Sequence, residues 1–269
     1  MHPTLKGRLM KINATLFVGA LALVTGAALA PAHGQDTSAP PPAAAAERPV
    51  PKLIVAIAVD QLSADLFAEY RNHFTGGFKR LLGGAVFPSG YQSHAATETC
   101  PGHSTILTGT RPARNGIIAN NWVDLNTART DKTVYCAEDE SVAGSSSLAY
   151  TVSDRHLLVP TLGERMKAAN PATQVVSVAG KDRAAVMMGG HKVDELWWWD
   201  GKKFASYAGR AVPEAVARTN AAVTDKIAAG QVPIDAPDYC RTRNRAVAIG
   251  AGKTVGTGQF ERAPGDTRR

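Results

Sequence analysis

Two short apolar runs rich in β-branched residues, separated by segments with helical spacing, constrain the fold of this chain most strongly. The runs are residues 52–61 (KLIVAIAVDQ) and 173–183 (TQVVSVAGKDR), and both have the length and composition of buried parallel strands. Strands that alternate with helices predict a largely parallel α/β sheet with helices on both faces. In such sheets ligands bind beyond the carboxyl ends of the strands. Asp60 and the Gly-Lys-Asp-Arg segment 180–183 both lie at such ends.

The segments around these runs carry the periodicity of amphipathic helices. Proline near the start of a segment, and glycine or Asn-Pro at its end, mark the boundaries. The predicted helices are residues 63–74, 76–85, 156–170 and 213–230. Residues 194–207 (DELWWWDGKKFASY) place Asp-Gly between two apolar arms and predict a β-hairpin.

The N-terminal residues 1–34 have the layout of a secretory signal peptide. Three cations precede the apolar run 12–30, and small residues follow it. The run is close to membrane-spanning length, so an uncleaved anchor is the alternative. Cleavage at the small residues is the favoured interpretation, and it predicts a periplasmic or secreted protein with no stable membrane insertion.

Residues 35–51 are rich in proline and alanine and lack apolar periodicity, so they predict an extended linker. Residues 52–269 then form the folded part, which is long enough for one α/β domain with a sizeable core. The formal charge of +7 falls to +4 when the three cations of the signal region are removed. With no Lys/Arg tract, this excess does not indicate nucleic-acid binding but suits a small anionic substrate.

The stretch ATETCPGHSTILTG, residues 96–109, has the features of a short helix. Pro101 suits its first turn, and Gly109 suits its end. With Thr99 or Cys100 as the cap, Ile106 and Leu107 are expected in the core. An anion at the start of such a helix is stabilised by free N–H groups and by the helix dipole. By itself, a threonine here is most simply a capping residue.

Three segments together resemble a known family. They are AVDQ (58–61), TETCPGHSTILTG (97–109) and RNGIIANNW (114–122), and GKDR (180–183) accompanies them. The combination is similar to the branch of the alkaline phosphatase superfamily that uses a threonine nucleophile. The nucleotide pyrophosphatase/phosphodiesterases have a related segment, but the residues here resemble the bacterial periplasmic alkaline phosphatases more closely. The resemblance implies the alkaline-phosphatase-like α/β fold.

The resemblance also implies a role for each matching residue. Asp60 would be a ligand of the Zn²⁺ that activates the nucleophile. Thr99 would contact that metal, attack phosphorus and form a phosphothreonine. Asn120 would donate its amide to a phosphoryl oxygen, while Lys181 and Arg183 would contact the non-bridging oxygens.

Alternatives remain for the nucleophile and for the substrate. Thr97 is a rival hydroxyl, but it lies further from the helix start and outside the family position. Phosphate monoesters are the expected substrates, because a dianion has an extra charged oxygen for Lys181 and Arg183 to neutralise. A phosphodiesterase and a non-catalytic periplasmic phosphate-binding domain are the alternatives.

The resemblance further implies a two-zinc site, with ligands from Asp-x-x-x-His, an Asp-His pair and a final histidine. None of these patterns occurs in this sequence, and His191 is the only histidine after Arg183. We therefore expect residues 52–269 to be the N-terminal part of the catalytic domain, weakly active or inactive. His103 is interpreted as a structural histidine. Of the three cysteines, Cys136 and Cys240 are the expected disulfide pair, because Cys100 lies within the motif.

Overall fold

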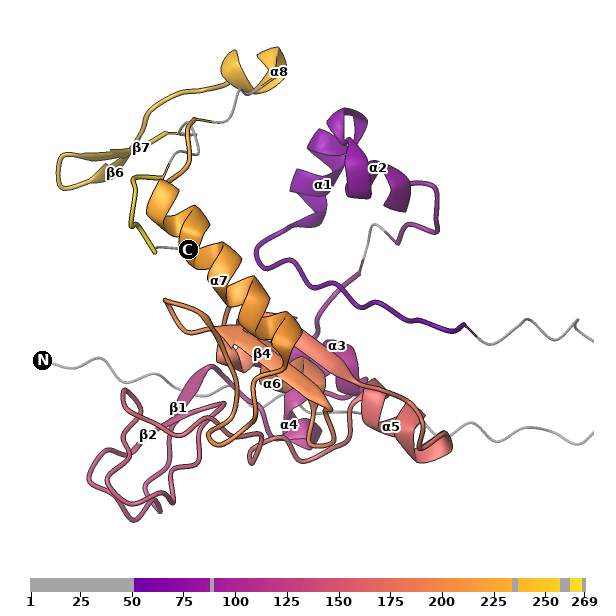
Figure 1. Ribbon diagram of the computed structural model, residues 1–269, viewed down its shortest axis with the longest axis vertical. Coiled ribbons are helices and arrows are strands. Elements are labelled where there is room, and N and C mark those ends of the chain that lie inside the picture. Colours follow the sequence, from indigo (N-terminus) through magenta and orange to yellow (C-terminus); the bar gives the residue numbers. More distant parts are fainter. Residues whose placement is uncertain (1–50, 88–89, 234–236, 257–261, 268–269) are drawn as a thin grey trace, which may run out of the picture. The chain divides into compact units, whose positions relative to one another are not determined.

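The structure, a computed structural model, describes residues 51–87, 90–233, 237–256 and 262–267 (Figure 1). The predicted signal peptide and the linker up to residue 50 lie outside these ranges. The chain divides into two units, Met1–Val55 and Ala56–Arg269. In the first unit, the described residues 51–55 form no helix or strand. Among the described residues, no helix combines the length and hydropathy needed to cross a bilayer.

The second unit contains α-helices, one 3-10 helix and short strands. The helices are α1 (Ala64–Tyr70), η1 (Arg71–His73), α2 (Gly76–Leu81), α3 (Thr99–Thr108), α4 (Pro112–Asn115), α5 (Leu162–Ala169), α6 (Asp182–Gly189), α7 (Glu214–Ala229) and α8 (Asp238–Arg241). The strands are β1 (Asn121–Val123), β2 (Thr133–Tyr135), β3 (Val176–Ala179), β4 (Glu195–Trp199), β5 (Phe204–Ala205), β6 (Val247–Gly250) and β7 (Lys253–Val255).

Most predicted helices form close to their expected positions. Helices α1, α2 and α7 confirm three of the predicted segments, and β4 and β5 form the predicted hairpin. Helix α5 begins later than expected, because Thr161 caps it. The Thr161 side chain accepts a hydrogen bond from the Glu164 N–H, and the Glu164 carboxylate accepts one from the Thr161 N–H. This capping box defines where the helix starts.

The sheet that supports the site has the order β3-β4-β5. Strands β3 and β4 are parallel, β4 and β5 are antiparallel, and α6 packs against β3 and β4 (Figure 1). The α/β class is therefore confirmed. Within the described part of the chain, however, β3–β4 is the only parallel pair of named strands, and the other named pairs are antiparallel.

The strand predicted at residues 52–61 is wrong for this structure. The segment forms no strand, and the side chains of Ile57 and Val59 are 70% and 48% exposed. A parallel strand is stabilised by hydrogen bonds to its neighbours, whatever its own propensity. The apolar run has no such neighbour among the described residues, so it forms no strand and its side chains stay exposed.

The core joins α3, α6, β4 and the loops that surround β2. It consists of Cys100, Ile117, Tyr135, Cys136, Ala137, Leu157, Ala185, Val186, Met187, Val193, Leu196 and Trp198. Ile106 was expected in this core but is 57% exposed. Inside the core, Cys100 forms a disulfide with Cys136. The expected Cys136–Cys240 pairing is therefore wrong: Cys240 lies in the exposed α8 as a free thiol.

Candidate active site

Thr99 is the first residue of α3. Glu98 precedes the helix in an extended conformation, so Glu98 rather than Thr99 or Cys100 is the cap residue. Pro101 lies in the first turn, where its missing N–H requires no partner. Gly109 ends the helix in the left-handed region with φ 66°, as predicted. Thr99 is thus at the end of a ten-residue helix that carries free N–H groups and partial positive charge.

Asp60 contacts the Thr99 side chain. The Thr99 hydroxyl donates a hydrogen bond to Asp60 Oδ2 over 3.2 Å. His103 Nε2 lies 3.8 Å from Asp60 Oδ1, and His103 Nδ1 is 2.8 Å from the Thr99 carbonyl oxygen. Because a carbonyl oxygen only accepts, Nδ1 carries the hydrogen of that bond. His103 is 7% exposed and is held by this bond.

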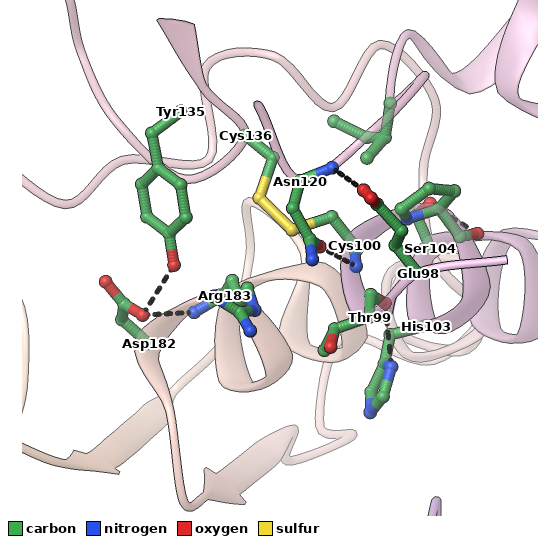
Figure 2. Close-up of a disulfide and its surroundings, with 12 residues drawn as sticks. Glu98, Thr99, Cys100, His103, Ser104, Asn120, Tyr135, Cys136, Asp182 and Arg183 are labelled. Atoms are coloured by element: carbon green, nitrogen blue, oxygen red, sulfur yellow. Dashed lines mark hydrogen bonds between the residues drawn. A yellow bond between two sulfur atoms is a disulfide. The ribbon is translucent and has the colours of Figure 1, made fainter. Parts of the chain in front are cut away.

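Asn120, just before β1, is held against the start of α3 by both its backbone and its side chain (Figure 2). Its N–H donates to Glu98 Oε2 over 2.5 Å, and its side-chain Oδ1 accepts from the Cys100 N–H over 2.9 Å. Its carbonyl oxygen accepts from the Cys136 N–H over 2.9 Å. Within the described part of the chain, its Nδ2 has no hydrogen-bond partner, so two N–H bonds remain available to a ligand.

Lys181 and Arg183 flank Asp182 at the start of α6. Lys181 is the exposed cap residue of this helix, and Arg183 lies in its first turn. Asp182 is 8% exposed and accepts hydrogen bonds from the hydroxyls of Tyr135, over 2.9 Å, and Tyr150, over 2.7 Å. Burial, together with the negative charge of Asp182, raises the pKa of Tyr135 to about 12.

Arg183 has a donor that no other described residue uses. Its Nε is buried and has no hydrogen-bond partner within the described ranges. Figure 2 shows the Arg183 side chain in the same region as Thr99 and Asn120. A buried guanidinium N–H without a partner is unfavourable unless a ligand accepts from it. The arrangement can therefore bind an oxyanion.

A cavity of about 590 Å³ adjoins these cations. The residues that line it come from the β1–β2 region, the loop around Ser147 and the start of α6: Asn121, Tyr135, Ser147, Leu148, Tyr150, Lys181, Asp182 and Arg183. Two cations, one carboxylate, two phenols and an amide form its wall, so its charged groups sum to a positive charge, which suits a small anionic molecule with an organic group.

The described residues supply an incomplete set of metal ligands. Asp60 and Thr99 provide two oxygen donors at one point. Nowhere in the described ranges do three or more His, Cys, Asp or Glu side chains gather as a metal site would require. Zinc sites in proteins typically use about four ligands. The donor chemistry of Asp60 and Thr99 suits one side of a zinc site, but these two residues alone do not bind the ion tightly.

Four residues around the site were not predicted as parts of it. Glu98, Cys100, Tyr135 and Tyr150 hold the predicted residues in place. The sequence carried a weak signal for the first two, since they are the chain neighbours of Thr99. It carried none for the tyrosines, because their partner Asp182 is 47 and 32 residues away.

A family model described as type I phosphodiesterase / nucleotide pyrophosphatase matches residues 54–248. The chain belongs to this family. Alkaline phosphatase PhoK of Sphingomonas sp is 61% identical over 218 residues, covering 80% of this chain and 39% of PhoK. Alkaline phosphatase PhoD of Zymomonas mobilis is 49% identical over 217 residues, covering 80% of this chain and 37% of PhoD.

A solved structure of alkaline phosphatase PafA is also similar, with a TM-score of 0.59 and 29% identity. It covers 72% of this chain and 40% of PafA. Another similar structure is a PafA variant with a threonine, an asparagine, a lysine and an arginine replaced. The predicted resemblance to bacterial alkaline phosphatases is thus confirmed. This chain spans about two fifths of the length of these relatives.

Proposed function

We propose that this chain carries the nucleophile and the phosphate contacts of an alkaline phosphatase that hydrolyses phosphate monoesters. The observation that carries the proposal is the Thr99 hydroxyl, which begins α3 and donates a hydrogen bond to Asp60. A hydroxyl at a helix N-terminus faces the position where an anion is most stable. Asn120 and Arg183, each with an unused donor among the described residues, supply further contacts to such an anion.

The proposed reaction has two displacements. Thr99 Oγ1 gives up its proton to the solvent and attacks phosphorus, the P–O bond to the alcohol breaks, and the departing alkoxide takes up a proton from the solvent. Water then attacks the phosphothreonine, which releases phosphate and restores Thr99. Asn120 Nδ2, Lys181 and Arg183 hold the non-bridging oxygens throughout, and they stabilise the charge that develops on them.

The spacing of the replaced residues in the PafA variant supports these roles. Its threonine and asparagine are 21 positions apart, and its lysine and arginine are two apart. Thr99 and Asn120 are also 21 positions apart, and Lys181 and Arg183 are two apart. Because the residue types and these spacings match, we propose that Thr99, Asn120, Lys181 and Arg183 correspond to the four replaced residues.

Zinc is the proposed cofactor, with Asp60 and Thr99 as the ligands from the described residues. When bound, Zn²⁺ lowers the pKa of a coordinated hydroxyl and so makes it a stronger nucleophile. A typical zinc site has about four ligands, and these residues supply two oxygen donors. We therefore expect weak metal affinity and slow turnover by this chain. We further propose a signal peptide at residues 1–34, a linker at 35–51, a catalytic part at 52–269 and a periplasmic or secreted location.

Monoesters are proposed over diesters because of charge. Lys181 is exposed beside the cavity, and Arg183 lines the same cavity. Two cations favour a dianionic phosphoryl group, whereas a diester places a second ester group at that position. Small phosphate monoesters, rather than nucleic acids, are therefore the proposed partners. Phosphodiester hydrolysis is the second candidate, because the matching family model is named for it.

The test compares Thr99→Ala with Thr97→Ala, a matched change at a neighbouring hydroxyl. The full chain is incubated with p-nitrophenyl phosphate and added Zn²⁺, quenched in acid, and analysed by mass spectrometry for phosphate on the peptide that contains both threonines. We expect slow, zinc-dependent release of p-nitrophenol and a phosphoryl group on Thr99, both lost in Thr99→Ala and retained in Thr97→Ala.

The other outcomes separate the alternatives. Faster turnover of bis-p-nitrophenyl phosphate than of the monoester would favour the phosphodiesterase. Binding of inorganic phosphate without any zinc-dependent turnover would favour a non-catalytic phosphate-binding domain. Equal phosphorylation of the Thr99→Ala variant and the wild type would contradict the assignment of Thr99.

A further inference from the structure

A buried disulfide involves the residue that follows the proposed nucleophile in the chain. The Cys100–Cys136 disulfide joins residues 36 positions apart, and both cysteines are fully buried (Figure 2). Cys100 follows Thr99 in the chain, and Cys136 follows Tyr135. The link therefore connects the start of α3 to the end of β2. One of its cysteines is the chain neighbour of Thr99, and the other is the chain neighbour of Tyr135.

Asn120 lies between the two ends of this link. Its side-chain Oδ1 accepts from the Cys100 N–H, and its carbonyl oxygen accepts from the Cys136 N–H, both over 2.9 Å. The disulfide spans the same gap as these two hydrogen bonds. Separation of Cys100 from Cys136 would break one of these two hydrogen bonds and so free either the side chain or the backbone of Asn120.

Tyr135, which precedes Cys136 in the chain, connects this region to α6. The Tyr135 hydroxyl donates to one oxygen of Asp182, and Tyr150 donates to the other. Asp182 lies between Lys181 and Arg183 in the chain, so the two phenols fix the first turn of α6. The pKa of Tyr135 is raised to about 12, so its hydroxyl keeps its proton in alkaline solution.

We propose that the Cys100–Cys136 disulfide and the Tyr135–Asp182 hydrogen bond form a bracket that positions Thr99, Asn120 and the Lys181/Arg183 pair relative to one another. These groups come from three separate elements, and sub-ångström placement of such groups is what makes binding and catalysis efficient. The bracket residues are positioning residues that act through their neighbours. The consequence for phosphate rests on the proposed function.

A disulfide that only stabilised the fold would behave differently. It would restrict the unfolded chain, so its removal would lower the free energy of unfolding without a local change in the native state. A bracket predicts a local change in the folded protein as well. The start of α3 and the bend at Asn120 would loosen while the rest of the core kept its protection.

The experiment uses the full chain and four variants: Cys100→Ala, Cys136→Ala, the double variant and Tyr135→Phe. Val134→Ala is the matched control, because Val134 is a buried residue of β2 outside the bracket. Amide hydrogen exchange is followed in peptides that cover residues 98–104 and 118–123. The affinity for inorganic phosphate is measured by calorimetry. Thiol titration of the unfolded wild type is expected to give one thiol, from Cys240.

We expect faster exchange at residues 98–104 and 118–123 in both single cysteine variants, and the same change in the double variant, because either substitution removes one shared bond. Phosphate affinity should fall about 10-fold or more in all three cysteine variants. Tyr135→Phe should weaken phosphate binding without changing exchange at residues 98–104. Val134 pairs with Trp122 across β1 and β2, so Val134→Ala is a control for residues 98–104 only. It should change neither the exchange at residues 98–104 nor the phosphate affinity.

The bracket is wrong if exchange at residues 98–104 is the same in Cys136→Ala and Val134→Ala, or if the unfolded wild type titrates with three thiols. Failure of the proposed function gives a different result. If the wild type does not bind phosphate at all, the function is contradicted, while the local exchange still decides for or against the bracket.

Discussion

Asp60 and Thr99 are in contact, yet the parts of the chain that carry them are held in different ways. Thr99 begins a helix whose next residues, Cys100 and Pro101, are buried, and Cys100 is cross-linked to Cys136 in the core. Asp60 lies at the end of an exposed segment that forms no strand, and its side chain contacts Thr99 and His103. The proposed phosphate contacts thus rest on a packed core, while the proposed metal ligand rests on a segment that buries almost nothing. This difference predicts that substitutions in the packed core lower the free energy of unfolding and the phosphate affinity more than substitutions in the segment that ends at Asp60.

The largest expected loss of stability comes from the buried ion pair in the packed part. Arg129 and Glu138 are 2.5 Å apart, and Glu138 is fully buried and also accepts the Tyr135 N–H. Removing one charge of a buried pair leaves the other without compensation, so Glu138→Gln should cost about 3–5 kcal/mol. Glu214→Gln is the control, because the Glu214–Arg218 pair is exposed and its loss costs about 0.5 kcal/mol or less. Urea unfolding measures the free energy of unfolding of both variants, and an equal loss in the two would contradict the comparison.

A matched pair of isoleucines tests the same contrast through packing. Ile117 is fully buried, and Ile57 is 70% exposed. Ile117→Ala should lower the free energy of unfolding by about 2–5 kcal/mol, since it removes buried methylenes and leaves a cavity. Ile57→Ala should change it by about 0.5 kcal/mol or less. A large loss at Ile57, seen in denaturant unfolding, would mean that the exposed segment contributes to the core after all.

The two sides of the site should separate in their response to phosphate. Arg183→Ala should weaken binding of inorganic phosphate about 10- to 100-fold, because it removes charge-assisted hydrogen bonds. Asp60→Ala should not weaken phosphate binding measured without added metal, but it should remove the effect of Zn²⁺. Calorimetry with and without Zn²⁺ measures both, with the exposed Arg165→Ala as a control. An equal loss of metal-free phosphate affinity in the Asp60 and Arg183 variants would contradict the separation, because it would show that the proposed metal ligand also contributes to phosphate binding.

The smallest effect is expected at alkaline pH. The pKa of Tyr135 rises from about 10 in the unfolded chain to about 12 in the folded protein, mainly through burial and then through Asp182. The stabilisation that goes with this rise is complete below pH 10 and is lost as the pH increases through 12. The free energy of unfolding should therefore fall less between pH 10 and 12 in Tyr135→Phe than in the wild type. Tyr91→Phe, at a ring that is 88% exposed, should keep the slope of the wild type.

The sequence predicted the local elements well, because their signals are local. Pro101 and Gly109 marked the ends of α3, Gly230 marked the end of α7, and Asp200-Gly201 marked the β4–β5 turn. Capping and turn chemistry depend on a few neighbouring residues, and those are present wherever the segment lies. The start of α5 was the exception, because Thr161 and Glu164 formed a capping box after the expected start.

The sequence by itself determined the α/β class, the existence and end of the helix α3 but not its cap residue, and the residues proposed to contact phosphate. Only the tertiary structure decided which cysteine pairs with Cys100, that Tyr135 binds Asp182, and that residues 52–61 find no strand partner among the described residues. Each of these depends on contact between residues far apart in the chain. Spacing along a sequence does not encode such distances, because they are determined by how the elements pack in the core.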